Sequence, residues 1–131
     1  MFDKCKNSKK QGDIGLGSAI QYFSSIGNTV LIPLTDSQDY DLIIDDENRL
    51  YKVQVKTTSY KSKHNIYTVG LKMQGGNSKT NTIHKTANEI KYDLLFILTE
   101  EGIRYLIPKS DIINIKSSIN LGKNYDKYIL N

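Results

Sequence analysis

Two segments in the middle of the chain, residues 40–45 and residues 50–56, divide into an apolar face and a more polar face when their residues are taken alternately. This alternation predicts two β-strands, each with one buried face. The residues between them, 46–49, are polar and include the aspartate and asparagine types that favour chain reversal. The pattern therefore predicts an antiparallel hairpin, with Leu42 and Ile44 on its apolar face.

The polar face of this hairpin carries Asp41 from the first strand and Gln54 and Lys56 from the second. A carboxylate, an amide oxygen and an ammonium group at one sheet edge are unfavourable neighbours unless a ligand binds there. Oxygen ligands suit Mg²⁺, which can bridge to a phosphate, and a lysine can assist water or neutralise charge on phosphorus. The pattern is that of a metal-dependent nuclease, although so short a motif also occurs by chance in other proteins. It also fits an edge hairpin with solvated charges that oppose aggregation.

A helical period precedes the hairpin. Apolar residues recur at spacings of three and four between Gly12 and Ile26, which predicts an amphipathic helix with Gly27 as its left-handed cap. Asp13 would lie in the first turn, where a carboxylate suits the helix dipole, so its catalytic role has a structural alternative. Residues 1–11 are polar and rich in lysine and predict a loose basic arm.

The remaining apolar segments predict a mixed sheet. Strands are expected at residues 28–33, 66–70, 92–99 and 103–107, with a helical turn over 108–115 and a docked tail at 117–131. The most apolar of them, residues 92–99, should be a central strand. Residues 73–88 show no sustained period, and residues 74–78 have the composition of a mobile loop. The order of elements indicates an α/β fold.

Composition narrows the class of protein. A chain of 131 residues predicts one domain, residues 1–131, with a single core. No apolar run is long enough for a membrane helix, and the first residues lack the apolar core of a signal peptide. The one cysteine, Cys5, excludes an internal disulfide and a cysteine-rich zinc site. We therefore expect a cytoplasmic protein with no membrane partner.

The positive charge is unevenly spread. The net charge is +4, and residues 60–92 contain many lysines but the lone acid Glu89. Such a segment suits a DNA backbone, although a lysine-rich soluble surface would look the same. Arginines are few, so bidentate readout of guanine has few candidates. The candidate DNA-binding residues are Lys10, Arg49, Lys61, Lys63, Lys72, Lys79 and Lys85.

Several stretches, in order, resemble the PD-(D/E)xK nuclease superfamily, and more narrowly its small group I intron-associated homing endonucleases. They are residues 10–15 (KQGDIG), 32–34 (IPL), 40–45 (YDLIID), 53–57 (VQVKT), 92–98 (YDLLFIL), 105–108 (YLIP) and 121–128 (LGKNYDKY). Archaeal Holliday-junction resolvases are a more distant similarity. The resemblance covers essentially the whole chain and implies a restriction-endonuclease-like core, in which helices flank a mixed β-sheet.

The resemblance also implies roles for the motif residues. Asp41 matches the first acid of the motif, a Mg²⁺ ligand, and Lys56 matches the motif lysine. Gln54 stands where Asp or Glu is usual, and the main-chain carbonyl of Val55 would complete the metal shell. Mn²⁺ should substitute for Mg²⁺. Because Gln54 is neutral, we expect weak metal binding until a DNA phosphate joins.

One position departs from the family pattern. Relatives commonly carry a glutamate in the first helix where this chain has Leu16. Asp13 lies three residues earlier, on the preceding turn, and is the nearest acid that could substitute for it. We therefore assign Asp13 to the catalytic set with Asp41, Gln54 and Lys56.

The sequence thus predicts a Mg²⁺-dependent endonuclease for double-stranded DNA. The resemblance implies intron homing, a specific and pseudo-palindromic site, and a homo-oligomer, either a dimer or a tetramer. Two alternatives stay open. One is a Holliday-junction resolvase. The other is a catalytically inactive DNA-binding subunit, which Leu16 favours.

Overall fold

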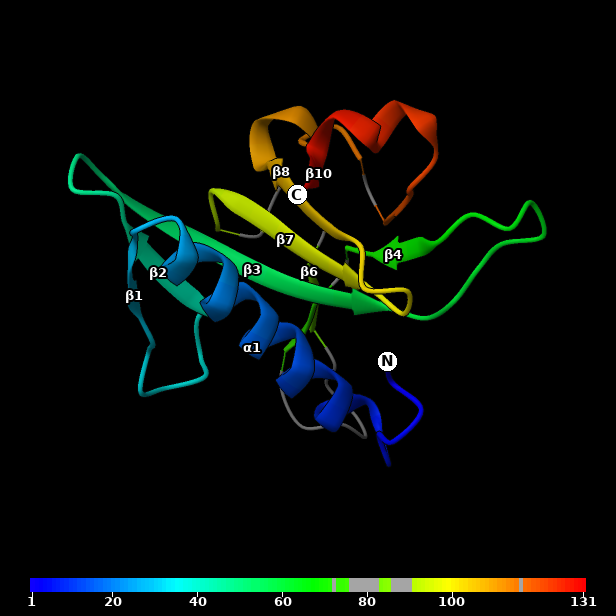
Figure 1. The fold of residues 1–131 in the computed structure, drawn as a ribbon, viewed down its shortest axis with the longest axis horizontal. Coiled ribbons are helices and arrows are strands. Elements are labelled where there is room, and N and C mark those ends of the chain that lie inside the picture. The colour runs from blue at the N-terminus through cyan, green and yellow to red at the C-terminus, as the bar shows by residue number, and fades with distance from the viewer. Residues whose placement is uncertain (72, 76–82, 86–90, 116) are drawn as a thin grey trace.

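The computed structural model describes residues 1–71, 73–75, 83–85, 91–115 and 117–131, and Figure 1 shows their arrangement. Within these residues the chain begins with one α-helix, α1 (Ser8–Ser25). The strands are β1 (Thr29–Leu31), β2 (Leu42–Asp45), β3 (Leu50–Thr58), β4 (Thr68–Gly70), β5 (Met73–Gly75), β6 (Ile83–Lys85), β7 (Leu94–Thr99), β8 (Arg104–Pro108), β9 (Ser118–Asn120) and β10 (Ile129–Leu130). Two 3₁₀-helices, η1 (Lys109–Asp111) and η2 (Lys123–Tyr128), follow β8 and β9.

The main sheet has six strands in the order β1-β2-β3-β7-β8-β10. Strands β3 and β7 are parallel, and the other neighbours are antiparallel. This mixed sheet with a flanking helix confirms the predicted α/β class. The predicted central strand is also confirmed, because β7 lies between β3 and β8 and its side chains are almost all buried.

The central hairpin forms as predicted. Leu42 pairs with Val53 and Ile44 with Tyr51, and all of these side chains belong to one apolar cluster. The turn between the strands is held by Asp46, whose carboxylate accepts hydrogen bonds from two backbone N–H groups. Strand β3 continues past the end of β2 to Thr58, so its second half pairs with β7 alone among the main-sheet strands.

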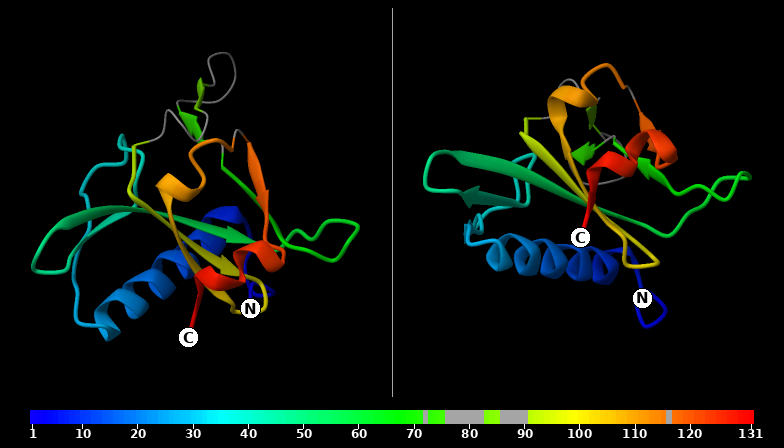
Figure 2. Two further views of the ribbon diagram at one scale, coloured as in Figure 1. Left: turned by 90° about the horizontal axis from the view of Figure 1, so that it is seen from above. Right: turned by 45° about the horizontal axis from the view of Figure 1, so that its top comes forward.

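Each face of the sheet has its own apolar core. On one face, Phe23 and Ala19 of α1 pack with side chains from β2, β3 and β7. On the other face, Leu95 and Ile97 of β7 pack with Val69 of β4 and with side chains from β8 and β9. Figure 2 shows α1 on one side of the sheet and the β5–β6 hairpin on the other. Strand β3 therefore has α1 against one of its faces only.

Two local predictions require correction. The helix begins at Ser8 rather than Gly12, because the Asn7 side chain caps it by accepting a hydrogen bond from Lys10 N at 3.0 Å. Residues 1–11 are therefore not a loose arm: Phe2 is buried, and its N–H donates to Glu100. Gly27, at a φ of 89°, ends the helix as predicted. No helix among the described residues is long and apolar enough to cross a membrane.

The stretch expected to lack structure contains a short hairpin. Met73 pairs with Lys85 and Gly75 with Ile83, which forms β5 and β6. The expected mobile loop over residues 74–78 is thus wrong for its first two residues, which belong to β5, and residues 76–78 lie outside the described part.

Helix α1 approaches β3 closely at Gly15. A Cβ atom at Gly15 would lie 2.5 Å from Cγ2 of Thr57 and 3.3 Å from Cγ1 of Val55. One turn earlier, Gln11 Nε2 donates to Thr57 Oγ1 at 2.9 Å. Glycine at position 15 therefore sets the separation between the helix and the strand that carries Gln54 and Lys56.

We expect Gly15→Ala to destabilise the protein and Gly17→Ala, its matched control, to stabilise it. The methyl group at position 15 must displace Thr57, and overpacking of this kind costs about 1–3 kcal/mol. A Cβ at exposed Gly17 meets nothing within 4 Å, and the better helix propensity of alanine adds about 1 kcal/mol. Urea denaturation measures both changes. Equal stabilisation of the two variants would show that the short distance between α1 and β3 does not require glycine at position 15.

Candidate active site

Asp41 is fixed at the edge of β3, one residue before β2 begins. Its N–H donates to the Val53 carbonyl at 2.9 Å, which continues the ladder of the hairpin. Its carboxylate Oδ2 accepts the Val55 N–H at 2.8 Å. The side chain thereby accepts a hydrogen bond from Val55 of β3, a backbone N–H beyond the reach of β2. This hydrogen bond holds the carboxylate beside β3.

Gln54, the residue before Val55, is almost completely buried, with 5% of its surface exposed. Its Nε2 donates to the Val55 carbonyl at 3.3 Å, a long hydrogen bond. Its Oε1 is buried and has no hydrogen-bond partner. Leaving a buried acceptor unpaired costs about 1–3 kcal/mol, so such an atom indicates a position where a ligand binds.

These residues line a cavity of about 600 Å³ between α1 and the start of β2. Its walls are formed by Lys9, Gly12, Asp13 and Leu16 of α1, by Asp36 of the β1–β2 connection, and by Asp41, Gln54 and Val55. The four helical positions follow the spacing of one helix face. The helix and the hairpin therefore present polar side chains to the same space.

Burial dominates the electrostatics of the site. Desolvation raises the pKa of Asp41, and the hydrogen bond from Val55 and the charge of Lys56 oppose this rise. Desolvation likewise lowers the pKa of Lys56, against the attraction of Asp41. Both groups thus lie in an environment that disfavours their charged forms. Such environments are common at sites that bind a charged ligand.

The donor set fits a hard divalent cation. Asp41 supplies a carboxylate, and Gln54 and the Val55 main chain supply neutral oxygens. Within the described part of the chain, no three Asp, Glu, His or Cys side chains are grouped closely enough to hold a metal by themselves. A site with one carboxylate and neutral oxygens leaves room for waters on a bound divalent cation.

The structure brings most of the predicted catalytic set together. Asp13, Asp41 and Gln54 line the cavity together. Lys56 is half-buried and interacts electrostatically with Asp41, although it is not among the residues that line the cavity. The helix-dipole alternative for Asp13 is wrong, because α1 begins at Ser8 and has no acid in its first turn. Asp13 therefore stays a candidate for a role in the site, because it lines the cavity.

Two cavity residues were not predicted. Lys9 lies one helical turn before Asp13. The capping residue Asn7 is the sequence signal for a helix that begins at Ser8, and such a helix puts Lys9 on the same face as Asp13. Asp36 lies in a loop, and no sequence pattern links it to the hairpin. Its place in the cavity follows only from the tertiary fold.

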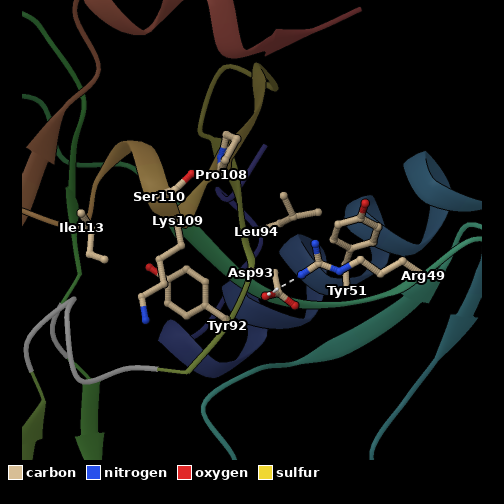
Figure 3. A pocket seen from close by; sticks show the side chains of 9 residues that line it. All are labelled: Arg49, Tyr51, Tyr92, Asp93, Leu94, Pro108, Lys109, Ser110 and Ile113. Carbon is tan, nitrogen blue, oxygen red and sulfur yellow. Dashed lines mark hydrogen bonds and ion pairs between the residues drawn. The ribbon is translucent and has the colours of Figure 1, made fainter.

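Arg49, a predicted DNA-binding residue, stands at the rim of another cavity, shown with its nine lining residues in Figure 3. Its guanidinium lies 4.5 Å from the centre of the Tyr51 ring and contacts the Asp93 carboxylate at 3.4 Å. Asp93 also accepts the Lys52 N–H at 2.9 Å. Arg49 is thus held in place in the free protein, at the start of β3.

The other predicted DNA-binding residues are dispersed. Lys10 is exposed on α1, and Lys63 is exposed in the loop after β3. Lys61, in the same loop, pairs with Glu101 at 3.0 Å. In Figures 1 and 2 this loop and the β2–β3 turn lie at opposite ends of the molecule. Lys72, Lys79 and the side chain of Lys85 lie outside the described part of the structure.

Comparison with known proteins adds two findings. Residues 6–127 match the family described as PD-(D/E)XK endonuclease. The fold is similar to that of a bacterial homing endonuclease, I-Ssp6803I, with a TM-score of 0.75 and 32% sequence identity. The similarity covers 89% of this chain and 79% of that one. No curated protein matches the sequence significantly.

We expect Asp41→Asn to make the metal-free protein more stable at neutral pH. Asparagine can still accept the Val55 N–H, but it removes a carboxylate that burial disfavours. Because the pKa of Asp41 is raised on folding, the folded wild type binds this proton more tightly than the unfolded chain. Its free energy of unfolding therefore falls as pH rises from the ordinary to the raised pKa.

Thermal unfolding in EDTA across that pH range measures the effect. The stability advantage of Asp41→Asn should grow with pH, and Asp126→Asn, at an exposed carboxylate of η2, should show no such trend. Added Mn²⁺ should stabilise the wild type and not Asp41→Asn. A less stable Asp41→Asn in EDTA at neutral pH would contradict the argument.

Proposed function

The chain belongs to the PD-(D/E)XK endonuclease family, and we propose that it is a metal-dependent endonuclease that hydrolyses phosphodiester bonds in double-stranded DNA. The observation that carries this proposal is the unpartnered Oε1 of buried Gln54 in the same cavity as the fixed carboxylate of Asp41. Two oxygens held in this way destabilise the ligand-free fold. They are suitable ligands for a divalent cation that also binds a phosphate of DNA.

Asp41, Gln54 and the Val55 carbonyl are the residues that would hold Mg²⁺, with Mn²⁺ as a substitute. The bound ion would polarise a phosphoryl oxygen and favour the hydroxide form of a water. Asp41 is oriented for this role by the Val55 N–H, and Gln54 by its hydrogen bond to the Val55 carbonyl. Because Gln54 carries no charge, the site gains its full negative charge only when a DNA phosphate arrives.

Lys56 and Asp13 complete the proposed catalytic set. Lys56 is half-buried near Asp41, where its ammonium group can donate to a phosphate oxygen as negative charge develops on it. Asp13 projects from α1 into the same cavity and can orient a water. Together they place a donor and an acceptor beside the proposed metal ligands.

We propose that Lys10, Arg49, Lys61, Lys63, Lys72, Lys79 and Lys85 contact the DNA. The β2–β3 turn and the loop after β3 lie at opposite ends of the molecule, so basic residues on them suit an extended duplex. Arg49 and Lys61 would exchange their carboxylate partners for phosphates. I-Ssp6803I is a homing endonuclease, and we propose a specific, pseudo-palindromic target and intron homing for this chain too.

Such a target requires a symmetric assembly, and β1 offers a surface for it. Strand β1 is an edge of the main sheet, and no charged residue occurs from position 26 to position 35. Ile26, Leu31, Ile32 and Leu34 are all exposed there. Natural edge strands usually carry charges that prevent pairing, so we propose that this edge joins copies of the chain in a homodimer or homotetramer.

Two other functions remain candidates. A Holliday-junction resolvase would use the same catalytic residues on a branched substrate. An inactive DNA-binding subunit is favoured by one observation: Leu16 places an apolar side chain in the cavity where relatives commonly carry glutamate. The unpartnered Gln54 Oε1 argues against an inactive site, because without a ligand it only reduces stability.

We expect the wild type to make discrete cuts in a plasmid library with Mg²⁺ or Mn²⁺. Asp41→Asn and Lys56→Ala should each slow cleavage by a factor of about 100 or more, because each removes a group that acts at the reacting phosphate. Lys123→Ala, at an exposed lysine of η2, is the control with unchanged cleavage.

Binding and branched substrates separate the alternatives. DNA binding by Lys56→Ala, measured by gel shift, should persist when cleavage is lost. Cutting restricted to four-way junctions would establish the resolvase. Binding by the wild type without any cutting of library or junction would establish the inactive subunit.

For assembly, we expect the double substitution Ile32→Glu and Leu34→Glu to produce monomers in sedimentation equilibrium. Two carboxylates at this edge would have to be buried or repel each other in a symmetric contact. Ile113→Glu, at an exposed apolar residue after η1, is the matched control and should leave the mass unchanged. A monomeric wild type, or an unaffected double variant, would reject this surface.

A further inference from the structure

The cavity holds an acid that the family motif does not assign, and we propose that Asp36 is a further residue of the metal site. It would bind the ion through water rather than directly, and it would supply charge that Leu16 does not provide. This inference rests on the proposed function, since it concerns the same cavity. It adds a residue from the β1–β2 connection to a site otherwise built from α1 and the hairpin.

The position of Asp36 carries the first part of the argument. Asp36 lines the same cavity as Asp41 and Gln54, although the three residues come from different segments. Its loop is held on both sides of the residue, because Thr35 Oγ1 donates to Gln38 Oε1 at 3.0 Å and Gln38 Nε2 donates to the Thr35 carbonyl. The exposed carboxylate is therefore kept at the mouth of the cavity.

The charge of the cavity carries the second part. The motif positions contribute only one carboxylate, Asp41, because Gln54 is neutral and Leu16 is apolar. The buried Oε1 of Gln54 has no partner and marks where a cation or a donor would bind. A divalent ion at that point is held more tightly when more negative charge is near than one carboxylate supplies. Asp36 and Asp13 are the further acids among the described residues that line the cavity, where Lys9 adds an opposing positive charge.

The three acids of the cavity do not suit direct coordination of one ion by all of them. Within the described residues, Asp13, Asp36 and Asp41 do not form a group close enough to coordinate one ion together. Mg²⁺ retains several of its waters in proteins, and a carboxylate outside the coordination shell can accept hydrogen bonds from them. Asp36 is thus a positioning residue, which acts on the ion and on its waters.

The test measures metal binding without DNA and without turnover. Titration of the ¹⁵N-labelled protein with Mn²⁺ broadens the amide signals of Gln54 and Val55 if the ion binds in the cavity. We expect Asp36→Asn to weaken binding by about three- to tenfold, as expected for the loss of a screened charge one water away from the ion. Asp126→Asn removes the same charge outside the cavity and should leave the affinity unchanged.

Leu16→Glu supplies the reverse change. It adds a carboxylate to the cavity wall and should tighten Mn²⁺ binding, and in this background Asp36→Asn should have a smaller effect than in the wild type. Folding of each variant is checked by its amide spectrum, which should match that of the wild type away from the cavity.

The possible results separate this inference from the function beneath it. Equal Mn²⁺ affinity for Asp36→Asn and the wild type would reject Asp36 while leaving the metal site and the nuclease intact. Absence of broadening at Gln54 and Val55 in the wild type at millimolar Mn²⁺ would reject the inference together with metal binding by the site in the absence of DNA. Plasmid cleavage then decides separately whether the chain is a nuclease.

Discussion

The close contact between α1 and β3 is the constraint on which the site depends. Gly15 lets the helix lie directly against Val55 and Thr57, on one face of the strand. Strand alternation then directs Gln54 and Lys56 away from this contact, so the helix supports the strand without occupying the place of the motif side chains. The same contact fixes the helix face from Lys9 to Leu16 as a wall of the cavity. A shift of the helix would therefore move the acids of α1 relative to Asp41.

The site is locally unfavourable, and the two cores around it compensate for this. Gln54 buries an unpaired oxygen, and Asp41 and Lys56 are charged groups in surroundings that disfavour charge. On either side, Phe96 and Leu95 belong to separate apolar clusters that hold β7 against the motif strand. Proteins commonly retain such strain where a ligand must later bind.

The parts of the fold that depend on local pattern could be predicted from the sequence. The alternation of faces in the two strands predicted the hairpin and its buried face, and it placed Asp41 and Gln54 together on the other face. The first turn of α1 was missed because its exposed residues carry no apolar period, and the cap Asn7 is its main signal. The pairing of β5 with β6 and the place of Asp36 depend on contacts between distant segments, which no local pattern specifies.

The pairing of β3 has a consequence for the order of folding. From Gln54 to Thr58 the strand has lost its β2 neighbour and pairs with β7, so this half cannot be fixed until residues 94–99 are present. Closing the intervening segment of residues 59–93 is a long-range step, which is slow compared with forming the hairpin. During synthesis, the amino-terminal half would leave the ribosome with all its motif residues and yet without an assembled site. Nuclease chemistry would then be withheld from the nascent chain until β7 has emerged.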